Sequence, residues 1–202
     1  MKKKLCAAVL ALSLACPSFH AQNLLNETPE QKDKRMEWFH KAKLGIFIHW
    51  GIYAVKGVSE SWSFYNKYLP HDEYMKQCEG FTASKYDPKA WVELIKESGA
   101  QYTVLTTKHH DGVALWDTKQ NGISVVKNTP AKRDLVTPFV NEVRKAGLRL
   151  GLYYSLPDWS HPDYPNMTRT DVRYKDDPKR WDAFCKFNFG QLKELNTTYK
   201  PD

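Results

Sequence analysis

The chain has 202 residues, of which 42% are hydrophobic and 13% aromatic; this is enough apolar material to bury a core and excludes the disordered class. Setting aside Lys2, Lys3 and Lys4 reduces the 30 basic residues to 27 against 23 acidic ones, so the formal charge of +7 falls to +4. Because the remaining charges are mixed along the chain, we expect a solvated surface and no nucleic-acid partner.

The first 21 residues have the composition of an export signal. A charged head is followed by an apolar stretch from Leu5 to Ala15, which is too short to span a bilayer permanently, and a plausible cut follows Ala21. The segment that ends at Cys16 is also similar to a bacterial lipoprotein cleavage site. We therefore expect a signal peptide at residues 1–21 and a periplasmic or extracellular protein, membrane-bound only if it is a surface lipoprotein anchored through Cys16.

Removal of this leader leaves two cysteines, Cys78 and Cys185. In an exported protein they can form one disulfide or remain as two buried thiols, and their wide separation does not decide between these states. The cysteine spacing does not match a metal site.

The predicted elements alternate between helix and strand. Pro29 opens the first helix, which Asn26 or Thr28 can cap, and Asp134 is the N-cap candidate of the third. Runs of apolar and β-branched residues before polar clusters predict the strands. The expected order is a helix from residue 29, strand 44–48, helix 88–99, strand 102–107, helix 134–147, strand 148–154 and a helix from residue 178.

Short helix-to-strand links and long polar strand-to-helix links predict right-handed βαβ units with a parallel sheet, which is the α/β class. In such sheets the functional groups gather at the carboxyl ends of the strands. A complete (β/α)8 barrel needs roughly 250 residues, more than the 202 present. Only three strands are predicted.

Polar and aromatic side chains follow all three strands. His49 comes after the first, His109 and His110 come after the second, and Tyr153 and Tyr154 end the third. Three strands that end alike predict one shared pocket. Aromatic rings can stack on the apolar face of a sugar, while imidazoles donate to and accept from hydroxyls, so sugar recognition is the favoured interpretation.

Two other interpretations of the histidines remain open. Imidazole is a common metal ligand, but adjacent histidines on an extended strand point to opposite faces, which disfavours one ion shared by His109 and His110. The histidines can also simply be hydrogen-bonded within a core. Metal binding is the weaker of the two.

The carboxylates near the predicted rim do not form a convincing catalytic pair. They are Glu60, Asp111, Asp117 and Asp158. Asp111 precedes Gly112 and is better interpreted as a turn residue whose side chain caps nearby N–H groups. Neither a nucleophile elbow nor a phosphate-binding loop is present in the sequence.

Four ordered motifs resemble the α-L-fucosidases of glycoside hydrolase family 29, and the resemblance runs from about Trp38 to the C-terminus. The motifs are Phe47-Ile48-His49-Trp50-Gly51-Ile52-Tyr53, Lys108-His109-His110-Asp111-Gly112, Lys132-Arg133-Asp134-Leu135 and Gly151-Leu152-Tyr153-Tyr154-Ser155. The resemblance implies a (β/α)8-like TIM-type barrel, here an incomplete N-terminal portion at residues 22–202 that stops before the fourth strand. It also implies retaining hydrolysis of terminal α-L-fucose from a fucosylated oligosaccharide or glycoconjugate, with no cofactor and no metal.

The resemblance assigns substrate contacts residue by residue. It implies that His49, His109 and His110 contact fucose hydroxyls and that Tyr153 lines the pocket, with Tyr154 as the alternative. A Glu-Trp pair of the family corresponds to Glu60 and Trp62, which are separated here by a serine. This spacing resembles the members that favour α-1,3/1,4 linkages, although linkage preference and oligomeric state stay open.

The family's nucleophile belongs to a Trp-Phe-Asp-Gly-like motif at the end of the fourth strand. The segment Tyr199-Lys200-Pro201-Asp202 resembles the stretch before that strand, so Asp202 is not expected to be the nucleophile. We therefore expect no catalytic residue within this chain, and negligible fucosidase activity from these 202 residues alone. The competing hypotheses are a non-catalytic sugar-binding barrel module and a metal-dependent barrel hydrolase.

Overall fold

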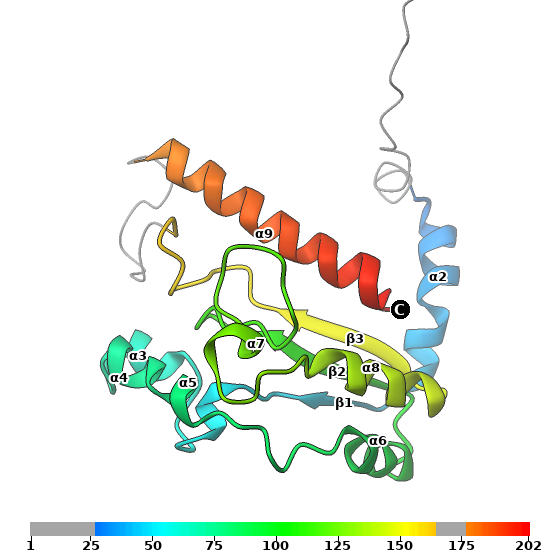
Figure 1. Cartoon of the computed structure of the whole chain (residues 1–202). Coiled ribbons are helices and arrows are strands. Elements are labelled where there is room, and N and C mark those ends of the chain that lie inside the picture. Colours follow the sequence, from blue (N-terminus) through cyan, green and yellow to red (C-terminus); the bar gives the residue numbers. More distant parts are fainter. Residues whose placement is uncertain (1–26, 165–176) are drawn as a thin grey trace, which may run out of the picture. The chain divides into compact units, whose positions relative to one another are not determined.

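The computed structural model describes residues 27–164 and 177–202 (Figure 1). The predicted signal peptide at residues 1–21, with the lipoprotein-like Cys16, lies outside the described residues. The chain divides into two compact units, residues 1–41 and 42–202, which are considered separately.

Helix α2, Pro29–Ala42, accounts for most of the described part of the first unit. Thr28 caps it reciprocally: the Thr28 N–H donates to Gln31 Oε1 at 2.9 Å, and the Gln31 N–H donates to Thr28 Oγ1 at 3.3 Å. This is the capping-box arrangement, and Pro29 occupies the first helical position, where its missing N–H is harmless. The prediction of Thr28 as a cap is confirmed, whereas Asn26 lies outside the described residues.

The second unit is built on a three-stranded parallel sheet of order β1-β2-β3. The strands are β1 at Gly45–Ile48, β2 at Tyr102–Lys108 and β3 at Arg149–Tyr154. Helix α6, Pro88–Glu97, connects the first two strands, and α8, Val136–Lys145, connects the last two. The predicted βαβ alternation and the α/β class are confirmed, and all three strand arrows point the same way (Figure 1).

Aspartate side chains begin three of the helices. Asp87 accepts from the Ala90 N–H before α6, and Asp177 accepts from the Arg180 N–H before α9, Pro178–Tyr199. Asp134 accepts from the N–H groups of Val136 and Thr137 and so caps α8, as predicted. It lies two positions before the first helical residue. These acceptors satisfy N–H groups that have no partner within the helix.

The strand-to-helix connections contain short elements that the sequence did not predict. After β1 come the 3₁₀ turn η1 (Ile52–Ala54) and helices α3 (Trp62–Tyr65), α4 (His71–Met75) and α5 (Gln77–Gly80); α7 (Val125–Asn128) follows β2. Four- and five-residue helices are too short to leave a readable apolar period. Helices α3, α4 and α5 lie beyond the carboxyl ends of the strands (Figure 1).

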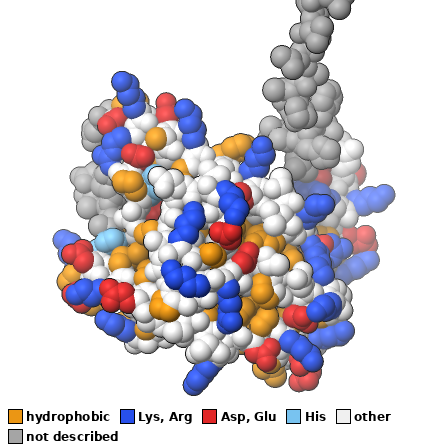
Figure 2. Space-filling view, viewed as in Figure 1, with side chains coloured by type: hydrophobic (Ala, Val, Ile, Leu, Met, Phe, Trp, Pro, Cys, Tyr) orange, Lys and Arg blue, Asp and Glu red, His pale blue; other side chains and the backbone are white. Residues whose placement is uncertain are grey.

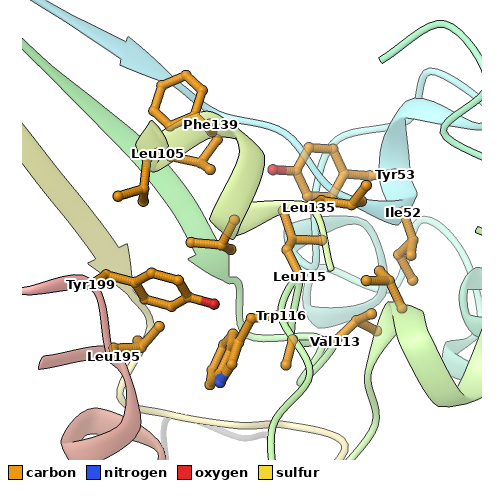
Figure 3. Close-up of a cluster of buried hydrophobic side chains, with 14 of the residues drawn as sticks. Ile52, Tyr53, Leu105, Val113, Leu115, Trp116, Leu135, Phe139, Leu195 and Tyr199 are labelled. Atoms are coloured by element: carbon orange, nitrogen blue, oxygen red, sulfur yellow. The ribbon is translucent and has the colours of Figure 1, made fainter. Parts of the chain in front are cut away.

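The core lies between the sheet and its helices. Leu105 of β2, Phe139 of α8 and Leu195 of α9 meet Leu115 and other side chains from the loop after β2 (Figure 3). On the opposite face of the sheet the Tyr102 ring lies over Gly45, where an added Cβ would come within 2.0 Å of it, and Phe47 is 49% exposed. The packed face therefore defines the fold, and the Phe47 face is left more open.

Both cysteines among the described residues are free thiols, Cys78 half-buried and Cys185 exposed in α9. The structure thus shows neither the disulfide nor a buried Cys185. On the face shown in Figure 2, Lys and Arg side chains are interspersed with Asp and Glu. Within residues 27–164 and 177–202, no helix has the length and apolar character needed to cross a membrane.

Glu194 of α9 fastens the loop that follows β2. Its carboxylate accepts from Trp116 Nε1 at 3.0 Å, Thr118 Oγ1 at 2.8 Å, the Lys119 N–H at 3.0 Å and Gln120 Nε2 at 2.9 Å. These four donors outweigh the cost of partial burial and lower the pKa of Glu194. The loop and α9 are therefore joined by one anion.

Replacing Glu194 by alanine is expected to lower the free energy of unfolding by about 2 kcal/mol, because the half-buried donors lose a charged acceptor. Chemical denaturation measures this difference. The matched control is Glu93→Ala on α6, whose exposed pair with Lys89 spans 3.8 Å and contributes less than about 0.5 kcal/mol. Equal effects of the two substitutions would contradict the assignment.

Candidate active site

The carboxyl ends of the three strands bring a group of aromatic and imidazole rings together. The His109 ring centroid lies 4.9 Å from that of His49, 4.8 Å from that of His110 and 6.3 Å from that of Tyr153. These residues follow or end β1, β2 and β3. The shared rim that the strand ends predicted is therefore formed.

The end of β2 explains how two adjacent histidines join one cluster. The pairing of β2 with β3 shifts register between Thr106 and Lys108, and the strand stops at Lys108. The alternation expected of adjacent histidines on an extended strand does not apply here, because both lie beyond the regular strand, and their ring centroids are 4.8 Å apart.

The loop after β1 adds an acid and a hydroxyl to this cluster. Glu60 Oε1 lies 3.0 Å from His49 Nδ1, and Ser61 Oγ lies 2.7 Å from His109 Nδ1. The serine between Glu60 and Trp62, which departs from the family's Glu-Trp pair, thus has its own imidazole partner. Sequence reasoning did not assign it a role.

The loop after β3 places aromatic and backbone groups beside His110. The Trp159 ring stacks on His110, with centroids 4.3 Å apart and planes 22° from parallel, and Trp62 meets His110 edge-on at 5.9 Å. Nδ1 of His110 lies 3.0 Å from the Pro157 carbonyl. Trp159 was one of many aromatic candidates near the strand ends, and only the fold distinguishes it from the others.

The two tyrosines that end β3 point to different surroundings. Tyr153 lies beside His109 and edge-on to Phe47 at 5.5 Å. The Tyr154 hydroxyl instead hydrogen-bonds with Asn188 at 2.6 Å and Gln191 at 2.7 Å on α9. The structure therefore brings Tyr153 to the cluster, in agreement with the first choice, and gives Tyr154 a packing role.

A buried ion pair lies beneath the site. Lys108 Nζ is 3.0 Å from Asp158 Oδ2, and the two side chains are 0% and 3% exposed. The ammonium also lies 4.3 Å from the centre of the Tyr154 ring. Gly112, at φ 78°, is packed so closely against Asp158 that an added Cβ would lie 2.4 Å from its Oδ1. Asp158 is therefore a joint between the loops after β2 and β3.

Asp111 is a structural turn residue, as predicted. Its Oδ1 accepts from the Val113 N–H at 3.0 Å and its Oδ2 accepts from the Tyr74 hydroxyl at 2.7 Å. Burial raises the pKa of Asp111 to about 6, although these donors oppose the rise. A buried carboxylate held in this way is not exposed to a substrate.

Burial disfavours the charged forms of His109 and His110. It lowers the pKa of His109 to about 3, with His110 and His49 adding a smaller repulsion, and it lowers the pKa of His110. A neutral imidazole has one donor and one acceptor nitrogen, which matches the two-way hydrogen bonding of a sugar hydroxyl. Among the described residues, no group of three His, Cys, Asp or Glu side chains is arranged to hold a metal ion.

Trp50, another predicted rim aromatic, packs away from the histidines. It stacks on Tyr86 with centroids 5.0 Å apart and meets Trp91 edge-on at 5.2 Å. Its ring lines one hollow with Phe81 and Trp91, and a second hollow with Trp91 and the neighbouring His49. Only some of the aromatic residues near the strand ends therefore lie beside the histidines.

A parallel sheet whose carboxyl ends carry this cluster defines an α/β protein with its polar site on one rim. The sequence profile of the family described as Alpha-L-fucosidase matches residues 12–202. The chain belongs to this α-L-fucosidase family.

Individual relatives agree. The human plasma alpha-L-fucosidase is 34% identical over 93% of this chain and 42% of its own length. Alpha-L-fucosidase isoenzyme 1 from Paenibacillus thiaminolyticus superposes with a TM-score of 0.74 at 39% identity, over 83% of this chain and 41% of its own. An alpha-L-fucosidase GH29 trapped covalent intermediate from Bacteroides thetaiotaomicron superposes with a TM-score of 0.72 at 37% identity, over 83% of this chain and 39% of its own. The chain spans about two fifths of the length of the curated relatives it matches.

Proposed function

We propose that this chain carries the sugar-recognition wall of a retaining α-L-fucosidase that releases terminal α-L-fucose from oligosaccharides or glycoconjugates. The observation that carries the proposal is the convergence of His49, His109 and His110 with Tyr153 at one sheet edge. Imidazole nitrogens and flanking rings supply polar and apolar contacts that match the hydroxyl groups and the apolar face of a deoxy-hexose. Glu60 and Trp62 complete the proposed wall.

A retaining mechanism requires two carboxyl groups about 5 Å apart that can reach the substrate. Asp111 and Asp158 are buried by Tyr74 and Lys108, and Glu60 faces His49. We therefore place the nucleophile and the acid/base in the part of the relatives' length that this chain does not span. The relative described as a trapped covalent intermediate supports the retaining course.

We further infer that the sheet extends beyond β3 toward a (β/α)8 barrel. The Asp202 N–H donates to the Leu150 carbonyl at 3.0 Å, and the Leu150 N–H donates to Asp202 Oδ2 at 2.9 Å. Asp202 thus already pairs with the free edge of β3. This supports a fourth strand beside β3 and disfavours a catalytic role for Asp202, which also meets Arg144.

Export to the periplasm or the cell exterior is part of the proposal and rests on the composition of residues 1–21. A lipid anchor through Cys16 is a finer alternative. The non-catalytic sugar-binding module is the competing function for the parent protein, and turnover of substrate separates the two.

The central test is hydrolysis of a nitrophenyl α-L-fucoside by the protein translated from the complete reading frame. His110→Ala is expected to lower kcat/KM by about tenfold to a hundredfold, because the variant loses the hydrogen bond that we propose between His110 and a sugar hydroxyl. Calorimetric titration with L-fucose should show a matching loss of affinity.

His40→Ala is the matched control, because it removes an exposed imidazole from α2, a helix that contributes no residue to the proposed wall. Fucose binding without turnover by the complete protein would favour the sugar-binding module. Turnover of a nitrophenyl α-L-fucoside that survives replacement of His49, His109 and His110 would contradict the proposed wall.

A further inference from the structure

His110 is held by the loop after β3 through three separate contacts. The Trp159 N–H donates to the His110 carbonyl at 2.8 Å, and the Trp159 ring stacks on the imidazole with centroids 4.3 Å apart. In addition, Nδ1 of His110 lies 3.0 Å from the Pro157 carbonyl. The first contact fixes the backbone of His110 and the other two fix its side chain, so residues of another loop set both its position and its ring plane.

The contact with Pro157 also determines which ring nitrogen of His110 carries a proton. A carbonyl oxygen only accepts, so a hydrogen bond to it requires a proton on Nδ1. Burial lowers the pKa of His110 and thereby favours the neutral ring. In that form Nε2 is an acceptor, and it points away from Pro157 because the two nitrogens of an imidazole face in nearly opposite directions.

The residue between the two that contact His110 anchors this loop to β2. Asp158 Oδ2 lies 3.0 Å from Lys108 Nζ, and Asp158 Oδ1 accepts from the Ser160 N–H at 3.1 Å. Lys108 ends β2, the strand that leads into His110. Because Asp158 is buried and has a partner at each carboxylate oxygen, its two neighbours in the chain are fixed relative to that strand.

Trp159 is the middle ring of a three-ring stack. Its centroid lies 4.3 Å from that of His110 and 4.4 Å from that of Tyr65, with planes 22° and 19° from parallel. Two rings that lie this close to the indole cannot share one of its faces without overlapping, so His110 and Tyr65 occupy opposite faces. The indole is therefore clamped between the end of β2 and helix α3.

Trp62, the other aromatic residue of the proposed wall, lies edge-on to all three rings of this stack. Its centroid is 5.0 Å from that of Tyr65, 5.3 Å from that of Trp159 and 5.9 Å from that of His110. Edge-on contact is a favoured geometry for aromatic pairs. One indole thus contacts two of the residues to which we assign sugar contacts, although they come from different loops.

The indole of Trp159 is held by these rings and not by a hydrogen bond of its own. Trp159 is 8% exposed, and its buried Nε1 has no acceptor within residues 27–164 and 177–202. Its side chain therefore contributes a flat surface to the site. Another flat ring at this position would keep that contribution, whereas an aliphatic side chain would not.

We propose that Trp159 is a positioning residue, which fixes the ring plane of His110 so that Nε2 is presented as an acceptor for a sugar hydroxyl, and which holds Trp62 against the same stack. The assignment of a sugar rests on the proposed function. The fixed orientation of His110 does not, because it is a property of the free protein.

The test is NMR of the complete protein labelled with ¹⁵N-histidine, recorded without sugar at mildly alkaline pH. We expect a pyrrole-type Nδ1 of His110 with a slowly exchanging proton, and a pyridine-type Nε2. Trp159→Leu removes the stack but keeps the main-chain N–H, so the imidazole should be released, its Nδ1 proton should exchange rapidly and both nitrogen shifts should move toward the average of the two tautomers. Trp159→Phe should restore the unsubstituted pattern.

Trp91→Leu is the matched control, because it removes an indole that meets the rings of Trp50 and Tyr86 and belongs to α6. It should leave the His110 signals unchanged. A proton on Nε2 of His110 in the unsubstituted protein, or the same His110 signals in Trp159→Leu as in the unsubstituted protein, would overturn the proposal.

Tyr65→Leu provides the decision if Trp159→Leu does not fold. It removes the ring on the far side of the indole and leaves the Pro157 carbonyl and the Trp159 N–H in place, so the His110 signals should change in the same direction by a smaller amount. His110 signals that stay unchanged in folded Tyr65→Leu would show that the stack does not fix the imidazole.

Titration with L-fucose separates this proposal from the proposed function. Trp159→Leu should weaken the affinity about tenfold, the effect of about one hydrogen bond, and Trp159→Phe should change it by less than about twofold. A fixed His110 in an unsubstituted protein that does not bind fucose would refute the function and keep the positioning role. Unchanged fucose affinity in Trp159→Leu with a released His110 ring would refute the positioning role and keep the function.

Discussion

Replacing Lys108 by methionine is expected to lower the free energy of unfolding by about 3–5 kcal/mol, the usual cost of leaving one member of a buried ion pair alone. Methionine preserves most of the side-chain volume, so the loss reports the charge of Lys108 and not a cavity. Asp158 would remain 3% exposed without its ammonium. Urea denaturation of the substituted and unsubstituted proteins measures the difference.

The double substitution Lys108→Met with Asp158→Asn should recover much of that loss, because no uncompensated charge is left in the interior. Lys119→Met is the exposed control: it breaks a surface pair with Asp117 and should cost less than about 1 kcal/mol. If Lys108→Met and Lys119→Met lower the free energy of unfolding equally, the buried ion pair does not stabilise the contact between the loops after β2 and β3.

The second large effect is a loss of stability in acid that depends on His109. Its pKa is lowered to about 3 in the folded protein, against an ordinary value of 6.5. Below pH 6.5 the unfolded chain binds a proton at His109, whereas the folded chain does not until the pH approaches 3. The free energy of unfolding therefore decreases as the pH falls below 6.5. Between pH 6.5 and 4.5 this amounts to about 2 kcal/mol.

His109→Gln keeps a polar partner for Ser61 and removes the titrating group. The unsubstituted protein should therefore lose roughly 2–3 kcal/mol more than the variant between pH 7 and pH 4.5. Asp111 acts in the opposite sense, since its pKa is raised to about 6 and its contribution falls as the pH rises. Because Asp111 is present in both proteins, comparing them separates the two effects.

The exposed His40→Gln substitution is the control for this experiment and should reproduce the acid profile of the unsubstituted protein. Unfolding free energies from denaturation at each pH give the comparison. Parallel profiles for His109→Gln and the unsubstituted protein would show that His109 is not held neutral by the fold.

The sequence was sufficient for the sheet because its signals are local. Apolar runs end at polar clusters, Pro29, Pro88 and Pro178 open helices, and Asp134 caps α8. Each signal depends on a few neighbouring residues, whose conformational preferences are the same in any fold. For the same reason the short helices after β1 were missed, because four residues give no period.

The candidate site was only partly predictable. Parallel strands deliver their ends to one edge, so the meeting of His49, His109 and Tyr153 followed from topology alone. The relative directions of His109 and His110 did not, because the register shift after Thr106 depends on pairing with β3. The choice of Trp159 over Trp50 likewise depends on where each loop packs.

The sequence by itself determined the α/β class, the alternation of helices with parallel strands and the residues that end those strands at one edge, because periodicity, caps and turns are encoded over short distances. The tertiary structure alone decided what those residues touch. Ser61 contacts His109 and Tyr74 contacts Asp111, although the partners are 48 and 37 positions apart in the chain. Burial, which lowers the pKa of both His109 and Lys108, is likewise a property of the packed protein.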